Sequence, residues 1–352
     1  MKQRNFKEIY DAIYSRVGKI MEARRKAALR KNVFAFLITL IIWVAVLMNG
    51  LKYYGPLMGV GLVLTIILLT IIINKINKEY KQTYKEQVIN EIVKQSNPNL
   101  KYDYKDGIGS KLYAESQFDF GWDRYHTEDR IYGEIEDGVT LNMAQVHTEE
   151  EHETTDSDGH TSRTYVTTFL GLYGIITLKT VTPADFMIKS NSKFSKFKKN
   201  RIEMESAEFE KYYDVYSSKT KDLELRQSAM EILTPETIEE FVKIRNMFKK
   251  AVNVRVCRDK IYFRIEVGDI FEPPTFKSSI DFEMLRRYFL IIDVPRMLYE
   301  ILIDNILVMY GDKGDKEKRN LSKMSQEEKE EYLKNKKAAE KATEETSYFS
   351  HN

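Results

Sequence analysis

Two long uncharged stretches near the N-terminus dominate the pattern of hydrophobic and polar residues. The first runs from Asn32 to Leu51, and the second runs from Tyr53 to Asn74. A helix rises about 1.5 Å per residue, so about 20 apolar residues span the ~30 Å hydrocarbon core of a bilayer. Turn-forming residues surround Lys52 between the stretches. The pattern predicts a hairpin of two transmembrane helices, 32–51 and 54–74, rather than two buried helices of a soluble protein.

Basic residues flank the two stretches unevenly. Residues 1–31 contain ten Lys and Arg against three Asp and Glu, whereas the loop between the stretches contains only Lys52. Four lysines follow the second stretch between residues 75 and 85. The positive-inside rule then places both ends of the hairpin on the cytoplasmic side. We therefore expect a multi-pass protein of the cell membrane with both termini in the cytoplasm and the lipid bilayer as a partner.

The polar segments on either side of the hairpin also have helical periodicity. Residues 1–31 carry apolar side chains at helical spacing, which predicts a cytoplasmic amphipathic helix. A second apolar stripe continues from Ile76 to Ile92 and predicts a helical extension over 75–96. That extension should end before Pro98, because proline disfavours helix at the preceding residue. We expect the two extensions to pack on each other.

From about residue 97 the pattern changes to alternating and β-branched residues. Residues 139–143 alternate, and residues 164–178 are rich in β-branched and aromatic side chains. With Asp158-Gly159 between them as a turn, they predict a β-hairpin with a polar, mobile tip. The remaining strands of the predicted sheet are expected at 201–205, 252–256 and 261–267.

Two helices are expected among or after these strands. Thr234 suits an N-cap and Pro235 the first helical position, which predicts an amphipathic helix ending at Lys249-Lys250. A second helix is expected over 281–309, kinked or broken at Pro295 and ended by Gly311.

Because strands and helices are segregated, the predicted fold class is α+β. We expect a transmembrane helical hairpin with cytoplasmic extensions, then a mixed, largely antiparallel β-sheet domain with helices at 97–311. Residues 312–352 are charged and predict a disordered or solvated helical tail.

Composition narrows the function only slightly. The formal net charge is +2 over 352 residues, which does not indicate a nucleic-acid partner. The lone Cys257 cannot form an internal disulfide or supply a cysteine-rich metal site. No nucleotide-binding, nucleophile-elbow or kinase motif is present, so we predict no cofactor.

Six segments in collinear order carry a further signal. They are EDRIYGEIEDGVTLNMAQV at 128–146, FLGLYGIITL at 169–178, MESAEFEKYYDVYS at 204–217, AMEILTPETIEEFVKI at 229–244, IFEPPTF at 270–276 and YFLIIDVPRMLYEIL at 288–302. Together they resemble one family, the bacterial "domain of unknown function 3137" proteins. The chain departs from that pattern at Ser217-Ser218-Lys219 and in its long acidic hairpin tip. The resemblance implies a membrane hairpin followed by a cytoplasmic domain, and it implies no known activity.

Two clusters contain residue types that could support catalysis or metal binding. His126, His147, His152 and His160 lie in one acidic window, but their spacing matches no metal motif, and the nearby Asp158-Gly159 lacks the acidic ends of a calcium loop. A solvated loop is the favoured interpretation. The second cluster contains five carboxylates, Glu203, Glu205, Glu208, Glu210 and Asp214. They could serve acid–base chemistry if one were buried, although a solvated acidic edge is favoured.

A basic stretch interleaved with phenylalanines runs from Lys189 to Arg201. Its central lysines, which we expect to contact anionic headgroups near the membrane, are Lys193, Lys196, Lys198 and Lys199. An ordinary basic loop is the favoured interpretation of this stretch, and lipid contact is the hypothesis to be tested.

The sequence leads to two hypotheses for function. The leading one is a non-enzymatic, membrane-anchored binding or scaffold module for a protein or lipid partner, with a homo-oligomer also open. The alternative is a membrane-tethered enzyme, such as a hydrolase, that uses the acidic or histidine residues. A pocket converging on those residues would favour the enzyme.

Overall fold

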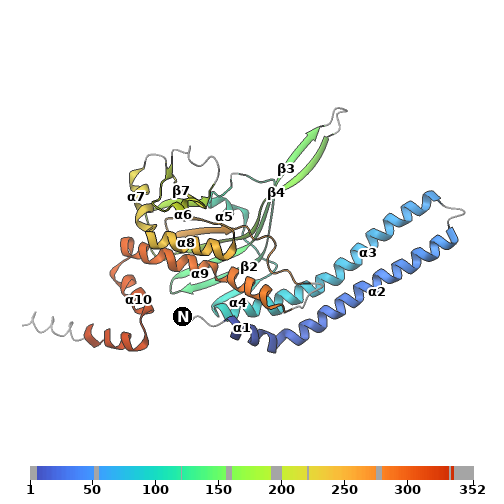
Figure 1. Ribbon diagram of the computed structural model, residues 1–352, viewed down its shortest axis with the longest axis horizontal. Helices are drawn as coiled ribbons and strands as arrows, with labels where there is room; N and C mark the ends of the chain where they lie inside the picture. Colours follow the sequence, from blue (N-terminus) through green and yellow to red (C-terminus); the bar gives the residue numbers. More distant parts are fainter. Residues whose placement is uncertain are drawn as a thin grey trace, which may run out of the picture.

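The computed structural model begins with a long helical hairpin that projects from the rest of the protein (Figure 1). One arm comprises α1 (Phe6–Ile13), the π-helical turn η1 (Tyr14–Gly18) and α2 (Lys19–Gly50). The other comprises α3 (Gly55–Tyr84), the π-helical turn η2 (Lys85–Ile89) and α4 (Asn90–Ser96). The structure describes residues 6–50, 55–119, 121–155, 161–191, 200–219, 222–274, 280–332 and 334–336.

Both arms are long and apolar enough to cross a membrane. The continuous helices that meet this criterion are Phe6–Ala45 and Val60–Ser96, and only 6% and 0% of their most apolar windows are buried in the protein. The arms contact one another, and Asn32 Nδ2 donates a hydrogen bond of 2.8 Å to Asn77 Oδ1. These apolar faces therefore do not pack into the core of the domain. The two predicted apolar helices and the end of α4 before Pro98 are confirmed.

A nine-stranded antiparallel sheet forms the centre of the described domain. Its spatial order is β1-β2-β3-β4-β9-β8-β5-β7-β6. The strands are β1 (Leu100–Asp103), β2 (Arg124–Glu136), β3 (Val139–Thr155), β4 (Thr161–Thr177), β5 (Asp185–Ser190), β6 (Arg201–Ile202), β7 (Tyr213–Ser217), β8 (Val252–Cys257) and β9 (Lys260–Ile265). The predicted strand at 201–205 was too long, because the chain leaves the sheet after Ile202.

Helices cover both faces of this sheet, most of them on one face. The helices that follow α4 are α5 (Ser110–Glu115), α6 (Ala207–Glu210), α7 (Leu223–Ile232), α8 (Pro235–Phe248), α9 (Phe282–Tyr310) and α10 (Lys313–Lys323). Buried residues of α4, α7, α8 and α9 share one core with Met143, Leu172 and Ile176. The intervening Tyr173 and Ile175 point to the other face, where Tyr113 of α5 packs. This alternation along β4 supplies both cores, and the predicted α+β class is confirmed.

The hairpin of β3 and β4 extends well beyond the sheet as a two-stranded ribbon (Figure 1). Its last described pair is Thr155 with Thr161, and β9 pairs with β4 only as far as Leu172. The Arg124 guanidinium lies 3.1 Å from the ring centre of Tyr165, which holds the ribbon near its base. The predicted hairpin is therefore present, whereas its expected Asp158-Gly159 turn lies outside the described residues.

Capping residues set the ends of the two longest helices of the domain. Thr234 accepts a hydrogen bond from the Thr237 amide at the start of α8, and Asp281 does the same for Met284 at the start of α9. Of the break or kink expected at Pro295, the break is wrong, because α9 runs through it as one helix. Proline removes one helical hydrogen bond, but the buried face of α9 around Pro295 packs into the core and maintains the helix.

The charged C-terminal region begins as a helix held by ion pairs. Arg319 of α10 pairs with Glu136 at 3.2 Å and with Asp304 at 3.0 Å. Its first part is thus attached to α9 and to the β2–β3 turn, and residues 337–352 lie outside the described residues.

Candidate functional site

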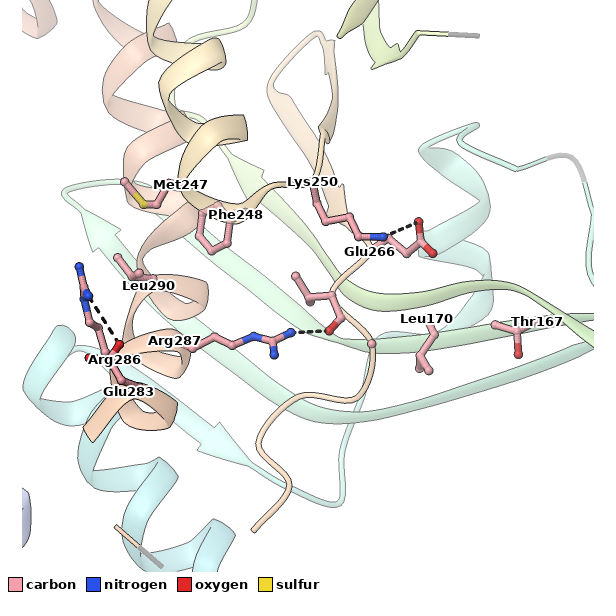
Figure 2. A pocket seen from close by; sticks show the side chains of 12 residues that line it. Thr167, Leu170, Met247, Phe248, Lys250, Glu266, Glu283, Arg286, Arg287 and Leu290 are labelled. Carbon is pink, nitrogen blue, oxygen red and sulfur yellow. Dashed lines mark hydrogen bonds and ion pairs between the residues drawn. The ribbon is translucent and has the colours of Figure 1, made fainter. Parts of the chain in front are cut away.

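A groove of about 1030 Å³ opens where α8 ends and α9 begins (Figure 2). The end of α8 forms one side because Lys249 adopts a left-handed conformation (φ 54°), which stops the helix and turns the chain towards β8. The first turns of α9 form the opposite side. Thr167 and Leu170, at the base of the β3–β4 ribbon, form the third side.

The groove combines apolar side chains with charges of both signs. Its apolar lining comes from Leu170, Met247, Phe248, Val267 and Leu290. Its charged lining comes from Lys250, Glu266, Glu283, Arg286 and Arg287, which gives three cations against two anions and a net charge of +1. The charged pairs are loose, since Lys250 lies 3.8 Å from Glu266 and Arg286 lies 3.6 Å from Glu283. Met247 is 48% exposed. This lining suits recognition by burial of apolar area with peripheral charge pairing.

The wall beside Val267 belongs to an irregular segment, residues 266–274, which we call the strap. Arg287 of α9 donates a 2.8 Å hydrogen bond to the Val267 carbonyl, and the Gly268 amide donates to the Leu170 carbonyl at 3.1 Å. Gly268 has φ +73°, a value that glycine adopts readily. Gln145 of β3 accepts from the Ile270 amide at 2.7 Å. The strap is therefore fixed to α9 and to the sheet at the edge of the groove.

The other end of the strap contacts the helical hairpin. Phe271, with φ 62°, is fully buried against Tyr102 and Tyr288. Glu272 then forms an ion pair of 2.6 Å with Lys81 of α3 and lies 3.4 Å from Lys85. The strap thus links the groove wall to the helix that continues from the second apolar stretch.

Lys85 and Asp129 form a buried ion pair at this junction. Their side chains are 1% and 0% exposed, and Lys85 Nζ lies 2.5 Å from Asp129 Oδ2. Tyr102 donates a hydrogen bond to the other oxygen of Asp129. Asp129 has φ 62°, at an irregularity in the pairing of β2 with β3. Burial raises the pKa of Asp129 to about 6 even though Lys85 lowers it. The carboxyl therefore exchanges its proton close to neutral pH.

The acidic cluster predicted from the sequence is divided between exposed side chains and ion pairs with Arg201. Glu203 is 88% exposed, and Glu205 and Glu208 are also exposed. Glu210 and the buried Asp214 instead pair with Arg201, at 2.8 and 3.0 Å. Glu203 also approaches Arg201, at 3.7 Å. Three of the five carboxylates thus surround one nearly buried arginine, which is a structural role.

The histidines are spread along the β2–β3 pairing. His126 and His147 are direct partners across the two strands, with ring centres 6.2 Å apart. His147 Nε2 lies 3.0 Å from Thr167 Oγ1 at the groove, and His152 lies further out on the ribbon. His160 lies outside the described residues. In the described part of the chain, no three His, Cys, Asp or Glu side chains are grouped to hold a metal ion.

The proposed lipid-contacting lysines, Lys193, Lys196, Lys198 and Lys199, lie outside the described residues. The two ends of their stretch are described. Lys189 on β5 donates a 3.2 Å hydrogen bond to the Phe118 carbonyl, and Arg201 on β6 pairs with Asp214. Both strands lie in the half of the sheet opposite β1, which contacts α4. Lipid contact by this stretch stays a prediction.

Comparison with protein families gives one match. Residues 167–302 match the model described as "Protein of unknown function (DUF3137)". This segment belongs to the DUF3137 family. The DUF3137 segment includes every residue that lines the groove, from Thr167 to Leu290, and the whole strap. Lys85, Tyr102 and Asp129 precede it. No curated protein and no solved structure gave a match.

The DUF3137 match agrees with five of the six segments that carried the sequence resemblance, and the segment at 128–146 lies before it. Sequence reasoning did not identify the groove, the strap or the Lys85–Asp129 pair. The one available signal for the pair was Lys85, a lysine next to the apolar stripe of a predicted packing helix. That signal alone does not separate a buried lysine from a solvated one.

Proposed function

We propose that this protein is a membrane-anchored module that captures an amphipathic segment of a partner protein in the groove. In this proposal, α2 and α3 cross the cell membrane, and both termini lie in the cytoplasm with the DUF3137 domain. The partner segment inserts apolar side chains between α8 and α9 and pairs its charges with the rim.

The anchoring part rests on exposure and charge. The apolar windows of the two helices are almost entirely unburied, which is unfavourable in water and favourable in lipid. Ten basic residues precede the first apolar stretch, and the connecting loop contains only Lys52. Reporter fusions at the C-terminus and at Lys52 test this topology. An exported C-terminal reporter would contradict the orientation.

The binding part rests on one observation, which is the composition of the groove. Its lining combines apolar side chains with cations and anions, the two kinds of residue found in the core and rim of a protein interface. A lipid headgroup carries few charges in a small volume, whereas a peptide can match Lys250, Glu283 and Arg286 at separate points. The mixed rim therefore favours a protein segment over a phospholipid.

The position of the groove supports a partner close to the membrane. Figure 1 shows that α8 ends and α9 begins on the side of the domain from which the helical hairpin projects. The β3–β4 ribbon projects from the same side, with Leu170 near its base. A partner segment held there lies between the ribbon and the hairpin, so a membrane protein or a membrane-bound protein fits the geometry.

Site-specific photocrosslinking in the full chain tests the proposal. A photoreactive residue replaces Met247 at the groove, and the control replaces Met230 on α7, which is also exposed. We expect Met247, and not Met230, to yield an adduct whose crosslinked peptide is amphipathic. Arg286→Glu should reduce that adduct severalfold, because it reverses one rim charge. Lys243→Glu makes the same change of charge on an exposed part of α8 outside the groove lining, and it should have little effect.

Three results would overturn the proposal. Adducts with phospholipid in place of protein would make the groove a lipid site. Equal adducts from Met247 and Met230 would indicate chance encounters. Equal effects of Arg286→Glu and Lys243→Glu would mean that the groove rim does not select the partner.

A further inference from the structure

A second, smaller pocket of about 320 Å³ lies where α3 meets the strap. Four polar residues of α3 line it: Asn74, Asn77, Lys78 and Lys81. Their spacing of three and four residues puts them on one face of the helix. Glu272 and Pro273 of the strap close the opposite side. The pocket is thus a polar recess between one helix face and an irregular loop.

The sequence of α3 indicates where this recess would lie relative to a bilayer. From Tyr53 to Ile73 the chain has no charged residue, and Asn74 is the first residue of the recess. Lys75, Lys78 and Lys81 follow within two turns. If α3 crosses the bilayer, as in the proposed function, the recess lies just outside the hydrocarbon core. Phospholipid phosphates occupy that level on the cytoplasmic side.

We propose that this recess binds the phosphodiester headgroup of an anionic phospholipid. The proposal rests on the membrane-spanning part of the proposed function and is independent of the partner in the groove. Lys78 supplies the cation and Asn77 supplies amide donors to the phosphate oxygens. The acyl chains extend along the apolar surface of α3.

The hydrogen bonds within the recess leave suitable donors for such a ligand. Lys81 is held by Glu272 at 2.6 Å, so it shapes the recess. Lys78 is exposed, and within the described part of the chain it has no ion pair. Asn77 Oδ1 already accepts from Asn32 Nδ2 at 2.8 Å, which directs the Asn77 amide nitrogen to other acceptors.

Asn32, the hydrogen-bond partner of Asn77, has an unsatisfied acceptor atom next to the recess. Its Oδ1 atom is buried and has no hydrogen-bond partner among the described residues. A buried acceptor without a donor is unfavourable, and most such atoms in proteins are satisfied. Asn32 is bonded to Asn77, at the edge of the recess.

Native mass spectrometry of the full chain in a neutral detergent tests this inference. The probes are phosphatidylglycerol and phosphatidylcholine with identical acyl chains. We expect retained phosphatidylglycerol, and Lys78→Gln should weaken that binding about fivefold, the effect of one cation near a lipid surface. Lys75→Gln is the matched control, because Lys75 is equally exposed and lies three residues away but does not line the recess. Thermal unfolding of both variants checks that they are folded.

The outcomes separate this inference from the proposed function. Equal losses in Lys78→Gln and Lys75→Gln would mean general attraction to the basic helix, and equal retention of both lipids would mean no headgroup recognition. Displacement of phosphatidylglycerol by excess glycerol 3-phosphate would mean a soluble phosphate site. Each of these results overturns the headgroup site while the reporter fusions still report a spanning α3. Failure of the reporter fusions overturns both.

Discussion

Replacing Lys85 with Met should destabilise the protein far more than the same change at Lys81. Lys85 is buried and pairs with the buried Asp129 at 2.5 Å. Methionine preserves most of the apolar stem of the side chain and removes only the charge. The change therefore leaves a carboxyl group buried without its cation, at the junction of the helical hairpin and the sheet.

The size of the effect follows from burial. Removing one partner of a buried ion pair typically costs about 3–5 kcal/mol. Contacts of Lys85 with Glu128 and Glu272 add little, since both carboxylates are more than a third exposed. In a domain of this size, each kcal/mol lowers Tm by about 2–4 °C, so the expected loss is roughly 10 °C. Lys81 pairs with the part-exposed Glu272, and Lys81→Met should cost at most about 1 kcal/mol.

The loss of stability caused by Lys85→Met should also depend on pH. The pKa of Asp129 in the folded protein is raised to about 6 from its ordinary 3.8. A raised carboxyl pKa means that the folded state favours the protonated form, so this contribution to stability is present below about pH 4 and lost as the pH rises through 6. The ion pair therefore exists in the original protein only above about pH 6. Below that value the difference between Lys85→Met and the original protein should shrink.

The assay is thermal unfolding of the full chain in detergent, followed by tryptophan fluorescence at pH 7.5 and pH 5. Trp122 lies in the aromatic cluster beside α5 and reports on the domain. Similar Tm values for Lys85→Met and Lys81→Met at pH 7.5 would refute the buried-pair reasoning. If Lys85→Met lowered Tm equally at both pH values, the claim that Asp129 becomes protonated between them would be refuted.

Three further predictions concern other parts of the domain. Arg201→Gln should cost about 3 kcal/mol in thermal unfolding because it leaves Asp214 buried without its cation, whereas Glu203→Gln should have almost no effect. Replacing residues 153–163 of the ribbon with Asn-Gly should change Tm by only a few degrees, because the described residues of that segment, 153–155 and 161–163, are exposed; a large loss of folded protein would show that the ribbon is needed for folding. Gly174→Ala should cost about 1–3 kcal/mol, since the added methyl would lie 2.7 Å from Met143 Cβ, and an unchanged Tm would contradict that packing.

The sequence predicted those elements whose signals are local. The apolar helices follow from uninterrupted runs, the β3–β4 hairpin follows from β-branched residues, and α8 follows from Thr234-Pro235. Short strands buried on both faces were missed. β7 (Tyr213–Ser217) is buried at every position and includes Asp214, so it has no alternation of polar and apolar residues that would identify it.

The candidate site could not be predicted, because distant segments build it. The groove joins Thr167, Met247 and Leu290, and its shape depends on the left-handed conformation of Lys249. Lysine has no special preference for that conformation, so no local sequence pattern predicts the turn. The ion pairs of the acidic cluster could not be predicted for a related reason. Its partner Arg201 lies on another strand, and only strand pairing brings it to Asp214.

The two π-helical turns determine how the apolar helices are rotated. A π-turn accommodates one extra residue in an α-helix, and one residue corresponds to about 100° of rotation about the helix axis. η1 lies in the first arm and η2 in the second, and Arg16 of η1 pairs with Glu91 just beyond η2 at 2.6 Å. Deleting one residue from η2 would turn α3 by about 100° relative to the sheet, which would rotate Lys78 away from the strap. A change of a single residue in length at η2 thus decides which side of α3 faces α2.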